Sequence, residues 1–274
     1  MVDYLELQKR ARAEINSALE IWTAILQETF GERIRYAYTK GSAIKSWDSI
    51  IDYVPEISDI DIHFRFTTLE DMIFSGDPFS QAMEISSEYE RRFLEEQPNA
   101  FHMPRSQLLL VDLLMEDVDY VPPRMSDIRV MIGTPKQIPL PSVDTIRSID
   151  LSQLKSLETF LKGLPMSVID RAGFDFWTII RRMTWRVSPS PVRLLTQTHP
   201  DPLEVWSWNR STIVKELEKQ GLDDISDAYT KFYKTGWQLY MSDFKDSNAY
   251  REMVKYGYLV LSGCLTRASI PNKS

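Results

Sequence analysis

The sequence predicts an α+β protein, with a mixed sheet and flanking helices in its N-terminal part and helices alone in its C-terminal part. Residues 34–38 and 59–66 alternate apolar and polar side chains with the period of a β-strand. After a proline-rich stretch at residues 135–141, apolar residues recur at helical spacing almost to the end of the chain. We therefore expect two domains, residues 1–141 and 142–274.

Composition narrows the class of protein. The 274 residues carry a formal net charge of -7 and give a pI of about 5.2, which makes nucleic acid an improbable partner. Cys264 is the single cysteine and cannot form an internal disulfide. The sequence has no secretory signal and no run near the roughly 20 apolar residues that span a bilayer. We expect a cytoplasmic protein without a membrane partner, and the oligomeric state stays open.

The first predicted elements lead into a glycine turn. Apolar residues three and four apart between residues 7 and 26 predict a helix, and Gly31 follows where such a helix ends. The strand at residues 34–38 then runs directly into Lys40-Gly41-Ser42. Residues 43–47 could begin a short helix, and a loop leads from there to the next strand.

The strand at residues 59–66 separates two kinds of side chain. Its apolar residues share one face, and its polar residues share the other because successive side chains alternate. The polar face carries Asp59, Asp61, His63 and Arg65. Since the apolar face must point toward the core, the two aspartates project together from the opposite side.

Three further elements complete the predicted first domain. Asp77-Pro78 provides a capping side chain and a proline at the start of a helix that extends to about residue 97. Residues 107–114 predict a third strand, apolar on both faces except for Asp112. Residues 129–132 predict a short fourth strand. A carboxylate inside an otherwise apolar strand indicates a functional position.

The glycine turn suits a phosphate group. Backbone N–H groups at a glycine turn that opens a helix bind phosphate, and Gly41 allows a close approach. Ser42 can add a hydroxyl, and Lys40 can add a positive charge. The alternatives are an ordinary strand-to-helix turn and a solvated lysine.

The carboxylates suit a divalent metal. Asp59 and Asp61 lie two apart on one strand, so their side chains can converge on one ion at their tips. Asp112 would add a third carboxylate from another strand. Mg²⁺ prefers a few carboxylates together with phosphates and water, and two ions would lie roughly 3.5–4 Å apart. The alternative is that Asp59 and Asp61 form the solvated face of a half-exposed strand.

Taken in order, these residues resemble the DNA polymerase beta-like nucleotidyltransferase superfamily. The pattern is a strand, Gly41-Ser42, a helix, and a strand bearing Asp59-Ile60-Asp61. A mixed first domain followed by a helical one is most similar to the aminoglycoside-type antibiotic nucleotidyltransferases. The resemblance implies that Gly41 and Ser42 hold phosphate, that Asp59 and Asp61 bind metal, and that Asp112 is the third acidic position. It covers residues 33–115.

The sequence departs from that pattern between the two motifs. Sixteen residues, 43–58, separate Ser42 from Asp59, more than compact members of the superfamily contain. The additional residues, about 47–56, must form a loop or an extended helix near the site. Their role is open.

Other residues have weaker patterns. Arg182 and Arg186 lie four apart on a predicted helix and, with Arg181 and Arg193, could clamp a triphosphate. A solvated basic helix face is the alternative. The three histidines lack zinc-site spacing, so we expect no structural metal.

The sequence therefore predicts an enzyme that transfers NMP from an NTP to a hydroxyl of a small molecule, with Mg²⁺ and with release of pyrophosphate. The alternatives are transfer to RNA or to a protein side chain, and a non-catalytic relative that binds a nucleotide. Neither the acceptor nor the base of the nucleotide follows from the sequence.

Overall fold

A computed structural model describes residues 4–68 and 77–269, which form two compact units. Among the described residues, the sheet unit comprises residues 4–45, 58–68 and 77–140, and the helical unit comprises residues 46–57 and 141–269. The fold is α+β, with a four-stranded mixed sheet in the N-terminal half and helices in the C-terminal part, as the sequence predicts. The expected boundary at residue 141 is where the chain enters the helical unit, but residues 46–57 also belong to that unit.

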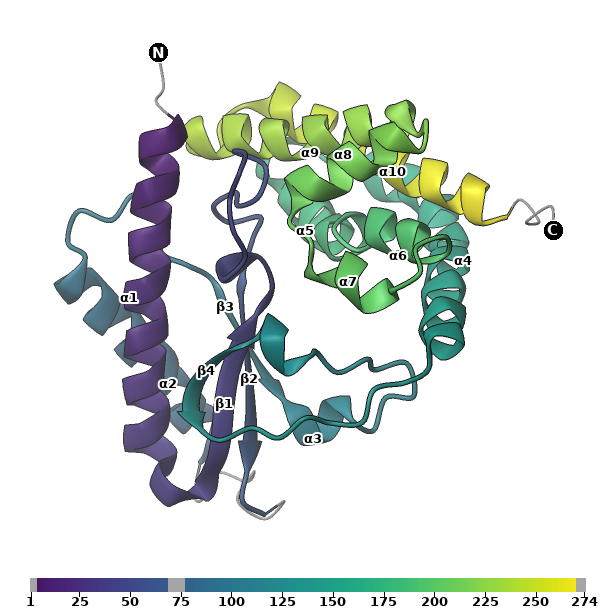
Figure 1. Cartoon of the computed structure of the whole chain (residues 1–274). Helices are drawn as coiled ribbons and strands as arrows, with labels where there is room; N and C mark the ends of the chain where they lie inside the picture. The colour runs from purple at the N-terminus through teal and green to yellow at the C-terminus, as the bar shows by residue number, and fades with distance from the viewer. Residues whose placement is uncertain (1–3, 69–76, 270–274) are drawn as a thin grey trace. The chain divides into compact units, whose positions relative to one another are not determined.

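The sheet unit follows the predicted order of strands and long helices, with differences at residues 43–47 and at the third strand (Figure 1). The short helix expected at residues 43–47 is not formed, because the 3-10 turn Gly41–Ala43 continues as turn and loop. Its helices and strands are α1 (Tyr4–Phe30), β1 (Ile34–Lys40), β2 (Ile60–Phe66), α2 (Pro78–Glu96), β3 (Ser106–Leu110), α3 (Val111–Leu114) and β4 (Arg129–Gly133). Asp77 caps α2 by accepting hydrogen bonds from the backbone N–H groups of Phe79 and Ser80, so the predicted helix start is confirmed. The predicted strand 107–114 is too long, because the chain turns into α3 at Val111.

The strand order is β3-β2-β1-β4, and β1 is antiparallel to both of its neighbours, whereas β2 and β3 are parallel. Helix α1 packs against α2 and contacts β1 and β4. The ring of Phe30 in α1 contacts that of Phe66 in β2, with 5.1 Å between their centroids. Ile60, Ile62 and Phe66 are buried on this side. The polar side chains of β2 therefore lie on the face away from α1.

The helical unit contains seven helices in its described residues: α4 (Val143–Val168), α5 (Phe176–Val187), α6 (Ser190–Thr196), α7 (Pro202–Ser207), α8 (Arg210–Lys219), α9 (Asp223–Met241) and α10 (Ser247–Ala268). Helix α10 packs against α4, α5, α6 and α9. The core between them is rich in aromatic side chains, among which Tyr229, Phe232, Tyr233 and Trp237 of α9 are at most 1% exposed. Aromatic side chains contribute much apolar area to a core, so these four residues stabilise the packing of α9.

Residues 46–57 lie against α8 and α9 within the helical unit (Figure 1). The carboxylate of Asp52, only 2% exposed, accepts hydrogen bonds from the backbone N–H groups of Asp48, Ser49 and Ser211 and from the Ser211 hydroxyl. These bonds hold a loop of the N-terminal half on the start of α8. The additional residues between the two sequence motifs, about 47–56, are therefore an ordered part of the helical unit.

A second group of contacts secures the same segment. The buried guanidinium of Arg210 donates to the carbonyls of Ile51 and Asp52 and lies 4.0 Å from the ring centroid of Tyr233. The indole of Trp237 donates to the carbonyl of Ile50 at 2.7 Å. Each of these donors satisfies a backbone carbonyl that would otherwise be buried without a partner.

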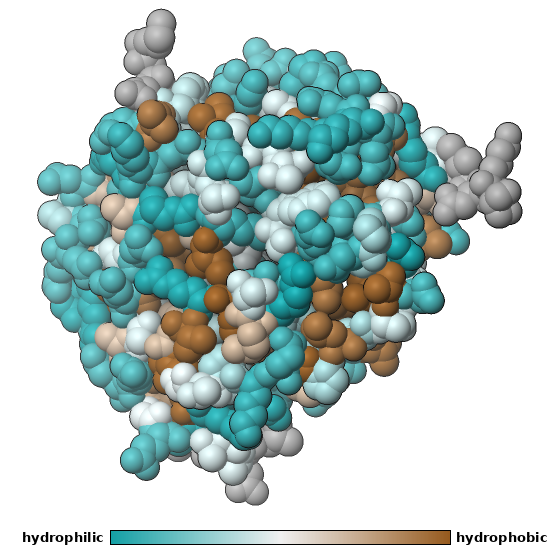
Figure 2. All heavy atoms as spheres, viewed as in Figure 1, coloured by the Kyte–Doolittle hydropathy of each residue, from teal (hydrophilic) through white to brown (hydrophobic). Residues whose placement is uncertain are grey.

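On the face shown in Figure 2, hydrophobic residues form separate patches between hydrophilic surface. Single exposed apolar side chains are ordinary on a folded protein, and Val118 and Ile169 are the most exposed here, at 92% and 77%. Among the described residues, no helix is long and apolar enough to cross a membrane.

Replacing Gly257 with alanine is expected to destabilise the helical unit by about 1–3 kcal/mol, because the site is closely packed. An added Cβ would lie 2.2 Å from the sulfur of Met183 in α5 and 3.1 Å from the ring of Phe232 in α9. Gly163→Ala is the matched control, since a Cβ there meets nothing within 4 Å. The control should gain roughly 0.5–1 kcal/mol from helix propensity. Thermal unfolding measures both, and equal effects would contradict the packing argument.

Candidate active site

The glycine turn follows β1 without a gap. Strand β1 ends at Lys40, and Gly41–Ala43 form one turn of 3-10 helix. The guanidinium of Arg12 in α1 donates to the carbonyls of Ala43 and Lys45, at 2.5 Å and 2.7 Å. The turn is therefore fixed at its far end by a side chain of the same unit.

Strand pairing brings Asp61 to this turn. Lys40 and Asp61 are direct partners in the antiparallel pair of β1 and β2. Gly41 has a φ of 81°, a conformation that side-chain-bearing residues rarely adopt. A Cβ on Gly41 would lie 3.1 Å from the Oδ2 atom of Asp61. The backbone conformation thus favours glycine here, and the neighbouring carboxylate leaves little space for a side chain.

Asp59 and Asp61 form the acidic part of the site. Burial raises the pKa of Asp61 to about 6, and the charge of Asp59 adds to this shift. Lys40, Arg105 and Lys45 lower the same pKa, which places three cationic side chains around the pair. A cation bound between the two carboxylates would favour their charged forms. The donor set therefore fits one hard divalent ion such as Mg²⁺.

The structure does not bring Asp112 together with these two aspartates. Asp112 lies in α3, and its carboxylate pairs with the guanidinium of Arg65 at 2.8 Å. In the parallel register, Asp61 lies beside Gln107, five residues before Asp112. Among the described residues there is no group of three or more acidic, histidine or cysteine side chains that could hold a metal.

The reason is local chain geometry. Helix α3 begins at Val111, and the N–H of Met115 donates to the Val111 carbonyl at 2.9 Å. This turn rotates Asp112 away from the strand alternation that the sequence pattern assumed.

Two further polar residues lie in this region. The sequence pattern does not identify Arg105, and it gives His63 a place on the polar face of its strand but no role. Arg105, which directly precedes β3, donates to the Oδ2 atom of Asp59 at 3.0 Å. His63 is only 1% exposed and stacks on Tyr38, with 5.1 Å between ring centroids. Burial lowers the pKa of His63 to about 3. The buried His63 side chain is therefore neutral, and it does not provide a charged contact for a ligand. Only a correct strand register could have identified Arg105.

The arginines of the helical unit divide into different roles. Arg193 lies 3.6 Å from the buried Asp150 carboxylate, and Arg181 donates to the carbonyl of Glu56. Arg186 lies 4.4 Å from the ring centroid of Phe160. Arg182 is exposed on α5. The binding of nucleotide by Arg182 stays a prediction.

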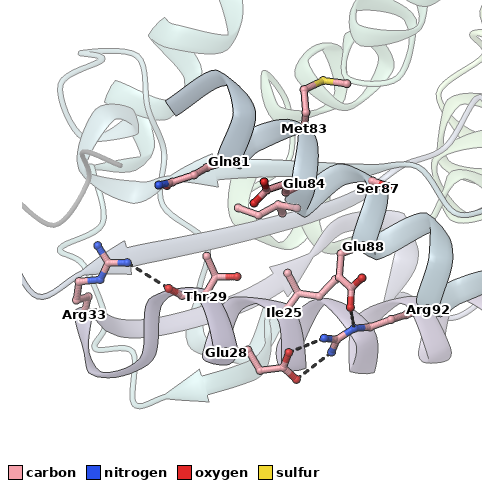
Figure 3. A pocket seen from close by; sticks show the side chains of 11 residues that line it. Ile25, Glu28, Thr29, Arg33, Gln81, Met83, Glu84, Ser87, Glu88 and Arg92 are labelled. Carbon is pink, nitrogen blue, oxygen red and sulfur yellow. Dashed lines mark hydrogen bonds and ion pairs between the residues drawn. The ribbon is translucent and has the colours of Figure 1, made fainter. Parts of the chain in front are cut away.

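A cavity of about 880 Å³ lies elsewhere, between α1 and α2 (Figure 3). Arg92 crosses its wall and pairs with Glu28 from α1 and Glu88 from α2, as the dashed lines in Figure 3 show. Neither the glycine turn nor the two aspartates line it. Arg92 thus links the two helices at this cavity through its ion pairs with Glu28 and Glu88.

Replacing Gly41 with alanine is expected to weaken metal-dependent nucleotide binding by at least about tenfold, because the Cβ would press on the Asp61 carboxylate. Gly31→Ala is the matched control. Gly31 also has a positive φ, of 53°, but a Cβ there meets nothing within 4 Å. Both variants should lose about 1–2 kcal/mol of stability from backbone strain. Calorimetric titration with Mg²⁺ and nucleotide separates them, and equal losses of binding would contradict a specific role for Gly41.

In comparisons with known proteins, no family model, no curated protein and no solved structure matches the chain.

Proposed function

We propose that the chain is a nucleotidyltransferase of the DNA polymerase beta-like type, which moves NMP from a Mg-bound NTP to a hydroxyl of a small molecule. The observation that carries the proposal is the contact between the glycine turn and Asp61. Gly41 has a φ of 81°, and a Cβ added to it would lie 3.1 Å from the Oδ2 atom of Asp61, so glycine suits this position best. This closeness supports the proposal, because backbone N–H groups of such a turn could bind phosphate beside carboxylates that would hold the metal.

The residues of the site divide the chemistry among them. The backbone N–H groups at Gly41 and Ser42 would orient the phosphates, and Lys40 would offset their charge. Mg²⁺ held by Asp59 and Asp61 would neutralise charge that develops on the phosphate oxygens.

In the reaction, the acceptor hydroxyl oxygen forms a bond to the α-phosphorus. The bond from that phosphorus to the bridging oxygen breaks, so pyrophosphate leaves with its electron pair. The hydroxyl proton would pass to water, because the carboxylate of Asp112 pairs with the guanidinium of Arg65.

The acidic character of the chain supports a small acceptor. The net charge of -7 disfavours RNA as the acceptor, because RNA binding rests mainly on contacts of basic residues with phosphates.

One observation favours a second candidate, a relative that binds nucleotide without catalysis. Strand β3 places Gln107, an amide and not a carboxylate, beside Asp61. A site with two carboxylates can bind Mg²⁺ and a nucleotide and still lack the groups for turnover.

Calorimetric titration with ATP, GTP, CTP and UTP, with and without Mg²⁺, tests both. We expect one nucleotide to bind only with Mg²⁺ and pyrophosphate to appear when a pool of small hydroxyl compounds is added. Metal-dependent binding without pyrophosphate in any pool would favour the second candidate. Absence of metal-dependent binding for all four nucleotides would exclude both.

A further inference from the structure

Arg105 lies beside the two aspartates, and its position bears on how many metal ions the site can hold. This inference rests on the proposed function. Ile60 of β2 pairs with Ser106 of β3, and the N–H of Ile60 donates to the carbonyl of Arg105 at 2.9 Å. Arg105 is therefore the neighbour of Asp59, and Gln107 is the neighbour of Asp61, on the polar face of the sheet. The strand beside the two aspartates thus offers a cation and an amide in place of a carboxylate.

Arg105 makes a defined ion pair in this position. Its Nη2 atom lies 3.0 Å from the Oδ2 atom of Asp59, and the two side chains are 22% and 20% exposed. A half-buried pair of this kind is screened less by salt than a surface pair. The guanidinium therefore acts as a fixed positive charge on one of the two candidate metal ligands.

The same arginine is not fully satisfied. Its Nε atom is buried and has no hydrogen-bond partner among the described residues. An unsatisfied buried donor costs roughly 1–3 kcal/mol, so stability alone does not account for the placement of Arg105. A role at the site does account for it.

The number of ligands restricts how many metal ions the site can hold. Two ions about 3.5–4 Å apart need carboxylates that bridge or surround them. The charge of Asp59 acts on Asp61, and the described residues contain no group of three or more acidic, histidine or cysteine side chains that could hold a metal. Of these two carboxylates, that of Asp59 already forms an ion pair with Arg105. Lys40 and Lys45 add further positive charge near Asp61. A second divalent ion would meet more cations than free carboxylates.

We propose that Arg105 takes the place of a second metal ion, so that the site holds one divalent cation and the guanidinium contacts the phosphates of the bound NTP. Arginine suits this role because its planar group can bind a carboxylate and a phosphate at once through different N–H groups. When a nucleotide binds, the remaining donors of Arg105 gain phosphate oxygens as partners.

The test counts bound metal ions by electron paramagnetic resonance, with Mn²⁺ as the metal and the α,β-methylene analogues of the four NTPs, which cannot react. The wild-type chain is expected to bind one Mn²⁺ per chain in the presence of the analogue that binds best. Two ions per chain would overturn the proposal while leaving the proposed nucleotidyl transfer intact. If neither Mn²⁺ nor any analogue binds, both the proposed function and this inference fail.

Arg105→Ala gives a second, independent measurement because its two effects have opposite signs. Loss of the guanidinium frees Asp59, so Mn²⁺ alone should bind a few-fold more tightly. Loss of the phosphate contact should weaken the analogue by about tenfold. Arg105→Lys, which keeps the charge, should retain most of the analogue affinity. The control is Arg35→Ala, at an exposed position of β1, which should change neither value.

A merely structural arginine gives a different result. Its removal would weaken both Mn²⁺ and the analogue, or neither, and either outcome would overturn the proposal. Circular dichroism shows whether Arg105→Ala is folded, and the metal count of the wild-type chain decides the question where it is not.

Discussion

Asp61→Asn is expected to reduce the rate of pyrophosphate release by about a thousandfold or more, and Asp59→Asn should have a similar effect. Asparagine has nearly the shape of aspartate but no charge, so it cannot hold Mg²⁺ against the phosphate oxygens. Charge stabilisation by a metal at such a site supplies several kcal/mol, and about 4 kcal/mol corresponds to a thousandfold in rate. The measurement is the steady-state rate of pyrophosphate release, with the acceptor pool that supports turnover of the wild-type chain.

Two matched replacements define what this result means. Asp144→Asn alters a carboxylate that is 96% exposed in the first turn of α4, and it should leave the rate unchanged. Asp112→Asn tests the third carboxylate expected from the sequence. Because Asp112 pairs with Arg65 rather than joining Asp59 and Asp61, we expect a loss much smaller than that of Asp61→Asn. Substantial turnover in both Asp59→Asn and Asp61→Asn would contradict the proposed mechanism.

Asp52→Ala is expected to destabilise the helical unit by about 3–5 kcal/mol. The carboxylate accepts four hydrogen bonds at a position that is 2% exposed, and alanine would leave these donors buried without a partner. For a unit of this size, each kcal/mol shifts the midpoint of thermal unfolding by roughly 2–4 °C. Calorimetry or circular dichroism should therefore show a decrease of about 6 °C or more.

The control for Asp52 is Asp227→Ala. Asp227 is 62% exposed in α9 and pairs with Lys231 at the surface, an interaction of at most about 1 kcal/mol. A second variant, Ser211→Ala, removes one hydroxyl donor but retains the carboxylate, so it should cost less than Asp52→Ala. If Asp52→Ala and Asp227→Ala melt at the same temperature, the segment at residues 46–57 is not held as described.

The sequence predicts the parts of this fold that depend on local pattern. Alternation in β2 places Ile60 and Ile62 in the core and Asp61 on the opposite face, because burial of one face dictates the period. The helix start at Asp77-Pro78 is confirmed because a cap and its donors lie within three residues of one another. The short helix expected at residues 43–47 is wrong, however, because the 3-10 turn Gly41–Ala43 ends at Ala43 and the chain continues as turn and loop.

The parts that failed depend on competition between structures or on distant contacts. Residues 108–114 contain leucines at positions that fit both a strand and a helical turn, so pattern alone could not place the end of β3 at Leu110. Arg105 could be recognised beside Asp59 only from the parallel register of β2 and β3. For about residues 47–56 the sequence predicts only a loop or an extended helix near the site, because the groups that bind Asp52 lie far away in the sequence.

This last feature also determines the order in which the protein can assemble during synthesis. Trp237, which donates to the carbonyl of Ile50, is 187 residues downstream, and Ser211 is 159 residues beyond Asp52. The glycine turn and the two aspartates are therefore synthesised long before Ser211 and Trp237, which bind the segment at residues 46–57 between them. Until α8 and α9 emerge, the buried side chains of that segment, Tyr53 and Val54 among them, have no surface to cover them. The nascent chain thus carries an uncovered hydrophobic segment until α8 and α9 have been synthesised, and only then can that segment take its final place.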